Sequence, residues 1–503
     1  MCRVGGVLAF ALATAGCVQS ANLDALAFRI AVTSDEPQAT IAGRDILAQG
    51  GNAVDAAVAM AMTMAVTLPS RVGLGGGGAC LVHDRTTGTV RALEFLPERQ
   101  PGADAASPLF LRGLFALHAE YGRLRWESLV IGAETAARFG APVSRAFDRD
   151  IAVAVTLLGE DAEAVRLLSR GDGLPIREGD TFEQLDLAAV LSQVRLGGVG
   201  TFYSGQLART YAESATAIGL PLDAAAVRAA QPAWVDPIAV GTGNDMLYFL
   251  ADSGAAGARQ ALIWAVLSEL YDYDDLAPDE RAHLLVEAQW RAAAAPPGLR
   301  FDQVGARRLM DGYDPQRRAA PSGGAAVGGF AATLAALSFD GTAVVCGFTL
   351  NGLFGSGRVA PGTGIFVARA PTQAALAIGG LAMLVNEPKA QFLYAGAADL
   401  VPALAVPLAE LLRREQTVDD ALAAPRAAPG LFADEALRQR TYVEESAGPA
   451  VLDGLRRRGH EVETVPSLGR GSAIYCLWDR ASTTVCRAAA DPRGAGLAYT
   501  LER

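Results

Sequence analysis

The sequence has little lysine, little histidine and no long apolar run beyond its start, and each scarcity excludes a class of protein. Lys389 is the only lysine among 43 basic residues, and the formal net charge is −11. Because phosphate groups require basic side chains opposite them, this charge argues against unaided nucleic-acid binding. The chain after the N-terminal segment lacks an apolar stretch of 18 residues, so we expect no membrane-spanning helix there.

The four histidines are widely separated, and no HExxH or CxxC pattern is present; they are His83, His118, His283 and His460. Histidine and cysteine usually bind metal ions through such patterns, so we expect no metal site built from them. Apolar sequence is abundant instead: 51% of the 503 residues are hydrophobic and 19% are charged. This composition predicts a folded protein with a large core.

Residues 1–20, MCRVGGVLAFALATAGCVQS, have the pattern of an export signal. One arginine precedes an apolar run that is too short to span a bilayer, and small residues follow. The ending at residues 14–17, TAGC, resembles the lipobox of bacterial lipoproteins. It predicts a signal peptide over residues 1–16, acylation of Cys17 and a tether over residues 17–30. Val18, in place of an aspartate, favours the outer membrane, with the protein facing the periplasm. The alternative is an ordinary signal peptide with an incidental cysteine.

Four cysteines remain after such a cleavage: Cys80, Cys346, Cys476 and Cys486. Export to an oxidising compartment permits disulfides. Cys476 and Cys486 each end a short β-like run, so a hairpin would place them side by side. The alternative is a pair of buried free thiols, and spacing alone does not choose between the two.

Local patterns predict helices and strands in separate blocks. A strand at residues 29–35 precedes two helices, one over residues 37–48 and one that begins after Asn52 as N-cap and ends at Leu68. Other segments with helical spacing are residues 110–139, 185–194, 259–270, 278–295, 401–414 and 418–423. Strands are expected at residues 79–83, 330–339, 343–350, 376–384 and 391–394.

Two connections in this pattern stand out. Asp340-Gly341 predicts a tight turn between two of the strands, and residues 307–329, rich in Arg, Ala, Gly and Pro, predict an exposed linker. Because strands and helices occur in blocks, we expect stacked antiparallel sheets covered by helices rather than a βαβ repeat.

The glycine-rich run at residues 73–78, GLGGGG, lacks the Lys-Ser/Thr ending and the strand-to-helix setting of a phosphate-binding loop. We interpret it as tight backbone packing or as a loop beneath a ligand, and not as a nucleotide site.

Several segments together resemble the γ-glutamyltranspeptidase family of N-terminal-nucleophile hydrolases. The phrase GGNAVDAA at residues 50–57, followed by the glycine-rich run, is similar to the opening of that family. Further similar segments lie at residues 116–145, 179–191, 200–208, 339–365, 418–426, 454–462 and 490–498. The similarity covers nearly everything after the signal.

This resemblance implies a single α+β domain, a four-layer αββα sandwich, over residues 31–503. Members of the family are made as precursors and cut themselves before a threonine. The cut would divide this chain into a large-subunit-like part, residues 31–330, and a small-subunit-like part, residues 331–503. The new terminal threonine supplies its hydroxyl as nucleophile and its amine as base, and glutathione is the usual donor. The resemblance implies no metal and no organic cofactor.

Alanine occupies the position of that threonine. When Asp340-Gly341 and Asn351 are matched to the family, its Thr-Thr-His-aromatic-Ser pattern falls on residues 331–335, AATLA. Ala331 then stands at the nucleophile position, and a methyl group cannot attack a carbonyl carbon. We therefore expect neither self-cleavage nor the covalent route.

The groups that hold the substrate in the family are replaced as well. Leu96 stands where an arginine binds the substrate carboxylate, and Arg99 would substitute only if the loop were shifted. Residues 366–373, FVARAPTQ, end at Gln373 without a carboxylate for the substrate amine. The serine pair falls near residues 377–380, AIGG, and the oxyanion-hole glycines fall near residues 396–399, GAAD.

Thr349 and Asn351 are retained. Their counterparts in the family support the nucleophile and face the substrate, so the resemblance makes both candidate substrate-binding residues. Alternatively, Thr349 is an ordinary strand residue and Asn351 is a turn residue before Gly352. We favour this structural interpretation for both. Among replacement nucleophiles, Thr333 would face the same side of its strand as Ala331, whereas Ser322 falls in the linker and Cys346 in a core strand.

The leading hypothesis is an envelope-tethered, non-catalytic relative that binds a small amino-acid or peptide-like ligand or acts as a scaffold. The rival is an active amidohydrolase with a shifted nucleophile, such as Thr333, and a non-glutamyl substrate. A third hypothesis is a decayed gene product with little function. We expect no nucleic-acid partner, and membrane contact only through the lipid anchor; the oligomeric state does not follow from the sequence.

Overall fold

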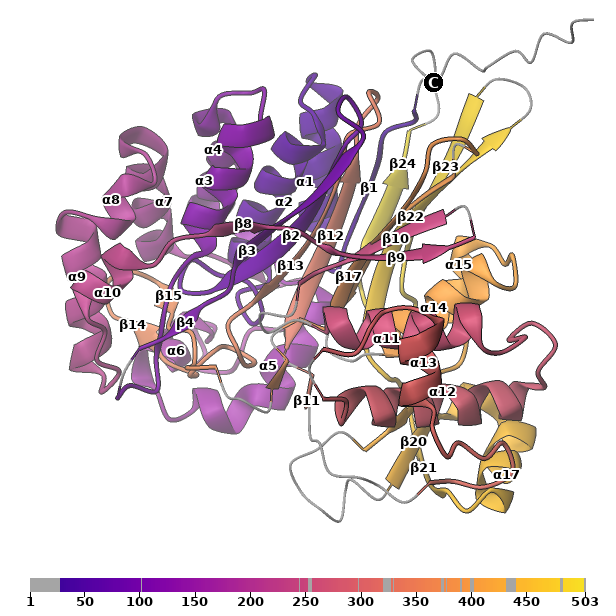
Figure 1. Cartoon of the computed structure of the whole chain (residues 1–503). Coiled ribbons are helices and arrows are strands. Elements are labelled where there is room, and N and C mark those ends of the chain that lie inside the picture. Colours follow the sequence, from indigo (N-terminus) through magenta and orange to yellow (C-terminus); the bar gives the residue numbers. More distant parts are fainter. Residues whose placement is uncertain are drawn as a thin grey trace, which may run out of the picture.

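Two β-sheets lie face to face, and helices cover their outer surfaces (Figure 1). The computed structural model describes residues 28–501 except for residues 101, 244, 252–255, 297, 320–326, 329, 372–374, 377, 390, 399–401, 431–439 and 480–482. The predicted α+β class and αββα layering are confirmed. The predicted signal peptide, Cys17, Ser322 and Gln373 lie outside the described residues.

The first sheet has seven strands in the order β24-β1-β12-β13-β2-β3-β8, with every neighbouring pair antiparallel. Their bounds are Leu497–Thr500, Ala31–Ser34, Ala331–Leu337, Ala343–Thr349, Gly77–Asp84, Thr89–Phe95 and Ala233–Val235, in that order. β12 and β13 are buried along their whole length. Their hairpin turns at Asp340-Gly341, as predicted, where Gly341 has a φ of 83°.

The second sheet has six strands in the order β23-β22-β18-β17-β10-β9, again antiparallel throughout. Their bounds are Thr483–Ala490, Arg470–Asp479, Gln391–Ala398, Gly380–Asn386, Asp245–Phe249 and Ile238–Thr242, in that order. Apolar side chains from both sheets fill the space between them, among them Leu81, Val345, Leu381, Met383 and Ile474. This alternation of inward side chains is what holds a sandwich together.

Helices on the outer face of the seven-stranded sheet come from the first half of the chain (Figure 1). α2 (Ala53–Thr67) is buried at every residue, and its Asn52 cap and Asp55 form a capping box, so the predicted start of this helix is confirmed. The others on this side of the molecule are α1 (Pro37–Ala48), α3 (Phe110–Tyr121), α4 (Trp126–Phe139), α5 (Arg145–Leu158), α6 (Ala162–Leu167), α7 (Leu185–Gly197), α8 (Gly200–Tyr203), α9 (Gln206–Ala217) and α10 (Ala224–Ala229).

The six-stranded sheet is covered by α11 (Gly257–Glu269), α14 (Pro402–Leu412) and α15 (Val418–Ala423). Beyond them lie α12 (Pro278–Ala293), α13 (Gln303–Leu309) and α17 (Gly448–Arg457). A small sheet, β19 (Ala427–Pro429), β20 (Arg440–Glu444) and β21 (Glu461–Val465), packs against this end. Short pairs complete the described fold: β4 (Glu98–Arg99) with β5 (Ala106–Ser107), β6 (Ala141–Pro142) with β7 (Thr181–Phe182), β11 (Val327–Gly328) with β16 (Ala375–Leu376), and β14 (Val359–Ala360) with β15 (Ile365–Phe366).

The prediction of an exposed linker over residues 307–329 is wrong for its first part. Residues 307–309 are the last turn of α13, and Leu309 and Met310 are buried in the cluster formed with α11. Farther on, the backbone N–H of Arg318 donates to the carbonyl of Arg458, which ties this segment to the body of the protein. Tertiary packing of two apolar residues therefore outweighs the local arginine and glycine content.

The glycine-rich run is tight packing, which confirms one of its two predicted interpretations. A Cβ on Gly76 would lie 2.4 Å from the carbonyl oxygen of Thr349, and one on Gly77 would lie 2.0 Å from that of Phe95. Real Cβ atoms do not approach backbone this closely, so only glycine permits the contact. The run thereby seats the start of β2 directly against the end of β13.

The four cysteines that follow the predicted cleavage site form two cross-strand disulfides. Cys476 and Cys486 bond across the β22–β23 hairpin, so the structure has the disulfide and not the pair of free thiols, two alternatives that the sequence left open. Cys80 of β2 bonds to Cys346 of β13 across a sequence separation of 266 residues, a pairing for which local spacing gives no signal. Among the residues described, no helix has the length and apolar character needed to cross a membrane.

Candidate functional site

The start of β12 is where the family's nucleophile is expected. Ala331 is fully buried and lies directly opposite Thr349 in the register of β12 and β13. The Thr349 hydroxyl donates to the carbonyl oxygen of Phe330 at 3.1 Å, on the peptide that joins residues 330 and 331. The position therefore has a hydroxyl beside that peptide bond, but the residue that follows the bond carries only a methyl group.

A buried ion pair supports this end of β12. Arg71 donates to both carboxylate oxygens of Asp150, from Nε at 2.7 Å and from Nη2 at 2.9 Å. Its Nη1 donates to the carbonyl oxygen of Ala331 at 3.0 Å, and the Ser70 hydroxyl donates to the same carboxylate at 2.7 Å. A guanidinium remains protonated and has no lone pair to accept a proton, so it positions the strand and cannot act as a general base.

Thr349 and Asn351 make contacts that are structural. The Asn351 backbone N–H donates to the Thr349 hydroxyl at 2.9 Å, and the Asn351 side-chain amide donates to the carbonyl oxygen of Arg369 at 3.0 Å. Asn351 has a φ of 59°, a left-handed conformation that asparagine tolerates better than most residues. These contacts are those of a strand residue followed by a turn residue.

Thr333, the predicted substitute nucleophile, lies inside the sandwich. Its backbone N–H donates to Asp35 Oδ2 at 2.7 Å, and its hydroxyl donates to the same oxygen at 3.2 Å and lies 3.4 Å from the Ser472 hydroxyl. The residue is fully buried and two positions within a central strand. An amine at this position would require two strand residues to be removed from the core.

The segments expected to hold the oxyanion hole and the carboxylate anchor have other roles. Gly396 belongs to β18, where it is paired with Leu381 and Ser472 on the two neighbouring strands. A Cβ there would lie 2.9 Å from that of Thr333, so this glycine permits the two sheets to approach each other. Leu96 packs against the apolar layer between the sheets.

Arg99 lies in a different setting, at an open cavity of about 470 Å³. Its Nε and Nη2 both donate to the carbonyl oxygen of Pro371, at 3.2 and 2.6 Å. Arg358 and Arg369 also line the cavity, with Asp104 as its one acidic residue. The Arg369 backbone N–H donates to the carbonyl of Leu350, so this arginine-rich cavity borders the turn that contains Asn351.

A buried carboxyl, Glu36, lies next in sequence to the Asp35 that binds Thr333. Glu36 is the N-cap of α1 and accepts from the backbone N–H of Gln38, while its Oε2 has no hydrogen-bond partner among the described residues. Burial raises the pKa of Glu36 to about 8, because the charged form is poorly solvated there. The carboxyl is therefore mostly protonated at neutral pH.

The raised pKa of Glu36 predicts that Glu36→Gln stabilises the protein at alkaline pH. The folded state favours the neutral acid, so its contribution is complete below pH 4.5 and is lost as the pH rises through about 8. At pH 9 we expect the variant to exceed the parent by on the order of 2–5 kcal/mol in the free energy of unfolding. Urea unfolding at pH 4.5, 7 and 9 measures this difference. Glu120→Gln, at an exposed position, is the control, and equal pH profiles for E36Q and the parent would refute the prediction.

Two histidines that are far apart in sequence meet in the structure. His283 Nδ1 lies 2.8 Å from His460 Nε2, and Glu287 is close enough that the three side chains could share a metal ion. His283 Nε2 lies 3.0 Å from the carbonyl oxygen of Asp314, and the Thr441 hydroxyl lies 2.9 Å from His460 Nδ1. Because a carbonyl only accepts, these contacts form one directed chain from Thr441 through both rings, and it accounts for every ring nitrogen.

Burial lowers the pKa of His460 to about 3 and also lowers the pKa of His283, so both rings are neutral in this chain of hydrogen bonds. His283 and His460, which are widely separated in the sequence, therefore lie in contact in the structure. They are 177 residues apart in the sequence, so no local pattern predicts their contact. The one available signal was the spacing of His283 and Glu287, which places both on one face of a helix.

Comparisons with known proteins agree with the geometry. The Gamma-glutamyltranspeptidase family model matches residues 39–373 and 382–501. Glutathione hydrolase 7 of Homo sapiens is 32% identical over 190 residues, which cover 35% of this chain and 28% of that protein. Glutathione hydrolase 5 proenzyme of Homo sapiens is 28% identical over 382 residues, covering 67% and 65%. The chain thus spans less than two thirds of the length of these curated relatives.

Among solved structures, cephalosporin acylase from Bacillus halodurans superposes with a TM-score of 0.78 at 19% sequence identity. The superposition covers 95% of this chain and 97% of the acylase. At this level of identity the likeness demonstrates a common fold.

Proposed function

The chain belongs to the γ-glutamyltranspeptidase family, and from that premise we propose that it is a non-catalytic member that binds a small amino-acid or peptide-like ligand in the cell envelope. The observation that carries the proposal is the methyl group of Ala331 at the start of β12, opposite Thr349. Covalent catalysis in this setting needs a hydroxyl and a free amine on one residue. Ala331 has no hydroxyl, and its nitrogen is part of the peptide bond with Phe330.

Among the described residues, the groups around Ala331 do not replace the missing hydroxyl and amine. Arg71 is bound to Asp150 and to the Ala331 carbonyl, and the hydrogen bonds of Thr333 are made within the core. Removing a single oxyanion-hole donor already raises a barrier by about 2.7–4 kcal/mol. Loss of the nucleophile removes the covalent route altogether. The fold, in contrast, keeps its turn glycines, caps and buried strands, which favours a retained binding role over decay.

Two further features support a ligand and a location. The arginine-rich cavity beside Asn351 offers guanidinium groups for the carboxylates of an amino acid or peptide. The lipobox-like ending at Cys17 supports an exported protein anchored by lipid to the outer membrane and facing the periplasm. Incorporation of labelled palmitate that is lost in Cys17→Ala tests the anchor; unlabelled parent protein would contradict it.

The loss of catalysis predicts one uncut chain without turnover. Purified protein should run as a single band near full length on a denaturing gel. It should release no more p-nitroaniline from γ-glutamyl-p-nitroanilide than buffer does, with an active member of the family as positive control. Thr333→Ala should leave both results unchanged. Two fragments, the smaller beginning at Thr333, or turnover that disappears in T333A, would establish the rival hypothesis of a shifted nucleophile.

A further inference from the structure

A second cavity, of about 390 Å³, lies between α12, α14, α15 and β20. None of its lining residues belongs to the expected catalytic strand β12 or to the arginine-rich cavity. Its size falls in the range of small-molecule sites, which are mostly apolar and carry a few polar groups. Binding in this cavity would not depend on whether the catalytic position at Ala331 is active.

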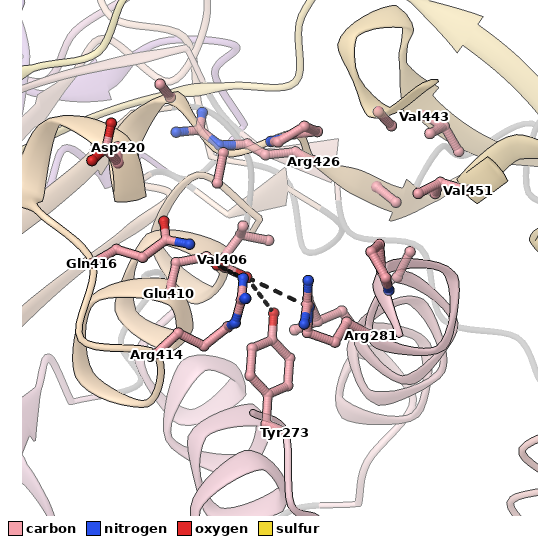
Figure 2. A pocket seen from close by; sticks show the side chains of 18 residues that line it. Tyr273, Arg281, Val406, Glu410, Arg414, Gln416, Asp420, Arg426, Val443 and Val451 are labelled. Carbon is pink, nitrogen blue, oxygen red and sulfur yellow. Dashed lines mark hydrogen bonds and ion pairs between the residues drawn. The ribbon is translucent and has the colours of Figure 1, made fainter. Parts of the chain in front are cut away.

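The polar floor of the cavity is centred on the buried carboxylate of Glu410. Figure 2 shows Tyr273, Arg281 and Arg414 gathered around it. The Tyr273 hydroxyl donates to Glu410 Oε1 at 3.2 Å, Arg414 Nη1 donates to Oε2 at 2.9 Å, and Arg281 Nε lies 3.8 Å from Oε1. Glu410 is 6% exposed, so its carboxylate is buried together with these partners.

Two arginines face one carboxylate on this floor, which leaves one positive charge beside the cavity. Arg281 also donates from Nη1 to the carbonyl oxygen of Leu276 at 2.8 Å and lies over the ring of Tyr273, 5.8 Å from its centroid. Gln416 has no side-chain hydrogen bond within the described part of the chain. Both side chains therefore retain donors that can reach a ligand. The remaining lining carboxylate, Asp420, lies apart from Glu410 in Figure 2 and accepts a hydrogen bond from Thr417.

The opposite side of the cavity holds a buried donor without a partner. Arg426 is 1% exposed, and its Nη2 is paired with Asp491 at 2.5 Å. Its Nε has no hydrogen-bond partner among the described residues. An unpaired buried donor is costly, and a bound acceptor would relieve that cost. Arg426 lies across the cavity from Arg281 and Arg414 (Figure 2).

The remaining wall is apolar. Four buried apolar residues, each at most 7% exposed to solvent, line this part of the cavity: Leu285, Val406, Val443 and Val451. Figure 2 places Val443 and Val451 together on one side, away from Arg414 and Gln416. The cavity therefore has an apolar wall next to its cationic floor, with Arg426 across the cavity from that floor.

We propose that this cavity binds a small molecule with one carboxylate on an apolar body. The carboxylate would accept from Arg281 and Arg414, and the apolar body would contact Leu285, Val443 and Val451. One excess positive charge matches a monoanion, and guanidinium groups recognise carboxylates through paired N–H donors. The site is separate from the family's catalytic position, and its ligand need not contain a γ-glutamyl group.

Calorimetry with two matched probes tests the charge. We expect 4-phenylbutyrate to bind with a Kd below ~1 mM, and the isosteric 4-phenylbutyramide to bind roughly tenfold more weakly or not at all. Arg281→Gln and Arg414→Gln should each weaken binding of the acid by roughly tenfold and leave the weak binding of the amide unchanged. Arg145→Gln, at an exposed arginine outside the cavity, should change neither.

A variant that leaves every charge in place tests the cavity itself. Ala447 lines the cavity and is half-buried, so Ala447→Trp should fill the space and abolish binding of the acid. If an arginine variant does not fold, this variant decides the test. Equal affinity for acid and amide, no binding of the acid below ~1 mM, or undiminished binding in A447W would each overturn the proposal.

Discussion

Replacing Cys80 and Cys346 together with alanine is expected to lower the free energy of unfolding by about 5 kcal/mol. The disulfide joins β2 to β13 across 266 residues, so it restricts the unfolded chain over more than half of its length. Both cysteines are fully buried, and alanine adds no polar group to the core in their place. Urea unfolding of the oxidised parent and of the double variant measures the difference.

The second disulfide is a matched control, because it has the same chemistry and a short loop. Cys476 and Cys486 are separated by 10 residues, for which the loop-entropy relation predicts a loss of about 3 kcal/mol. The cost should therefore depend on which pair is removed. Equal losses for the two double variants would show that loop closure in the unfolded chain is not the source of the stabilisation.

Replacing Arg71 with methionine is expected to cost about 3–5 kcal/mol, because it leaves the carboxylate of Asp150 buried without its partner. The ion pair is nearly inaccessible, with side-chain exposures of 6% and 7%. The Ala331 carbonyl loses its Arg71 donor in the same variant. Chemical denaturation at neutral pH measures the loss.

Two further variants distinguish the cost of an unpaired buried charge from a nonspecific loss of stability. Arg71→Met combined with Asp150→Leu should be less destabilised than Arg71→Met alone, because no buried charge remains unpaired. Arg145→Met breaks the exposed pair with Glu178 and should leave the unfolding midpoint unchanged. If the double variant had a lower free energy of unfolding than Arg71→Met alone, the cost could not be assigned to the unpaired Asp150.

These two predictions concern the same region of β12 and β13, where the expected chemistry is missing. Cys346 and Thr349 lie on β13, and Ala331 lies on β12 opposite Thr349. A buried methyl group at residue 331 packs at no cost to the sheet, whereas a catalytic threonine there would have to remain accessible. The interior can thus keep its packing while the site loses its reactive oxygen.

Sequence patterns predicted the features that depend on neighbouring residues. The Asn52 cap with Asp55, the Asp340-Gly341 turn and the bounds of the first two helices needed only local hydrogen bonds and backbone preferences. The missing hydroxyl at residue 331 could also be predicted from the sequence, because it follows from the identity of one residue matched to a family pattern.

Contacts between residues far apart in the sequence could not be predicted from local patterns. Local spacing carries no signal for the pairing of His283 with His460, of Cys80 with Cys346, or of Arg71 with Ala331. The same reason explains the error over residues 307–310, where burial of Leu309 and Met310 against α11 outweighs an exposed composition.

The sequence by itself determined the family and, through that resemblance, the αββα class, because both rest on motifs of local sequence. It also determined the absence of a hydroxyl at residue 331, which depends on the identity of one residue. Only the tertiary structure decided that Thr333 is enclosed in the core, that Glu36 is buried with a raised pKa, and that Arg281, Glu410 and Arg414 surround a cavity. Burial and charge pairing arise when segments far apart in the chain pack together, and no local pattern encodes them.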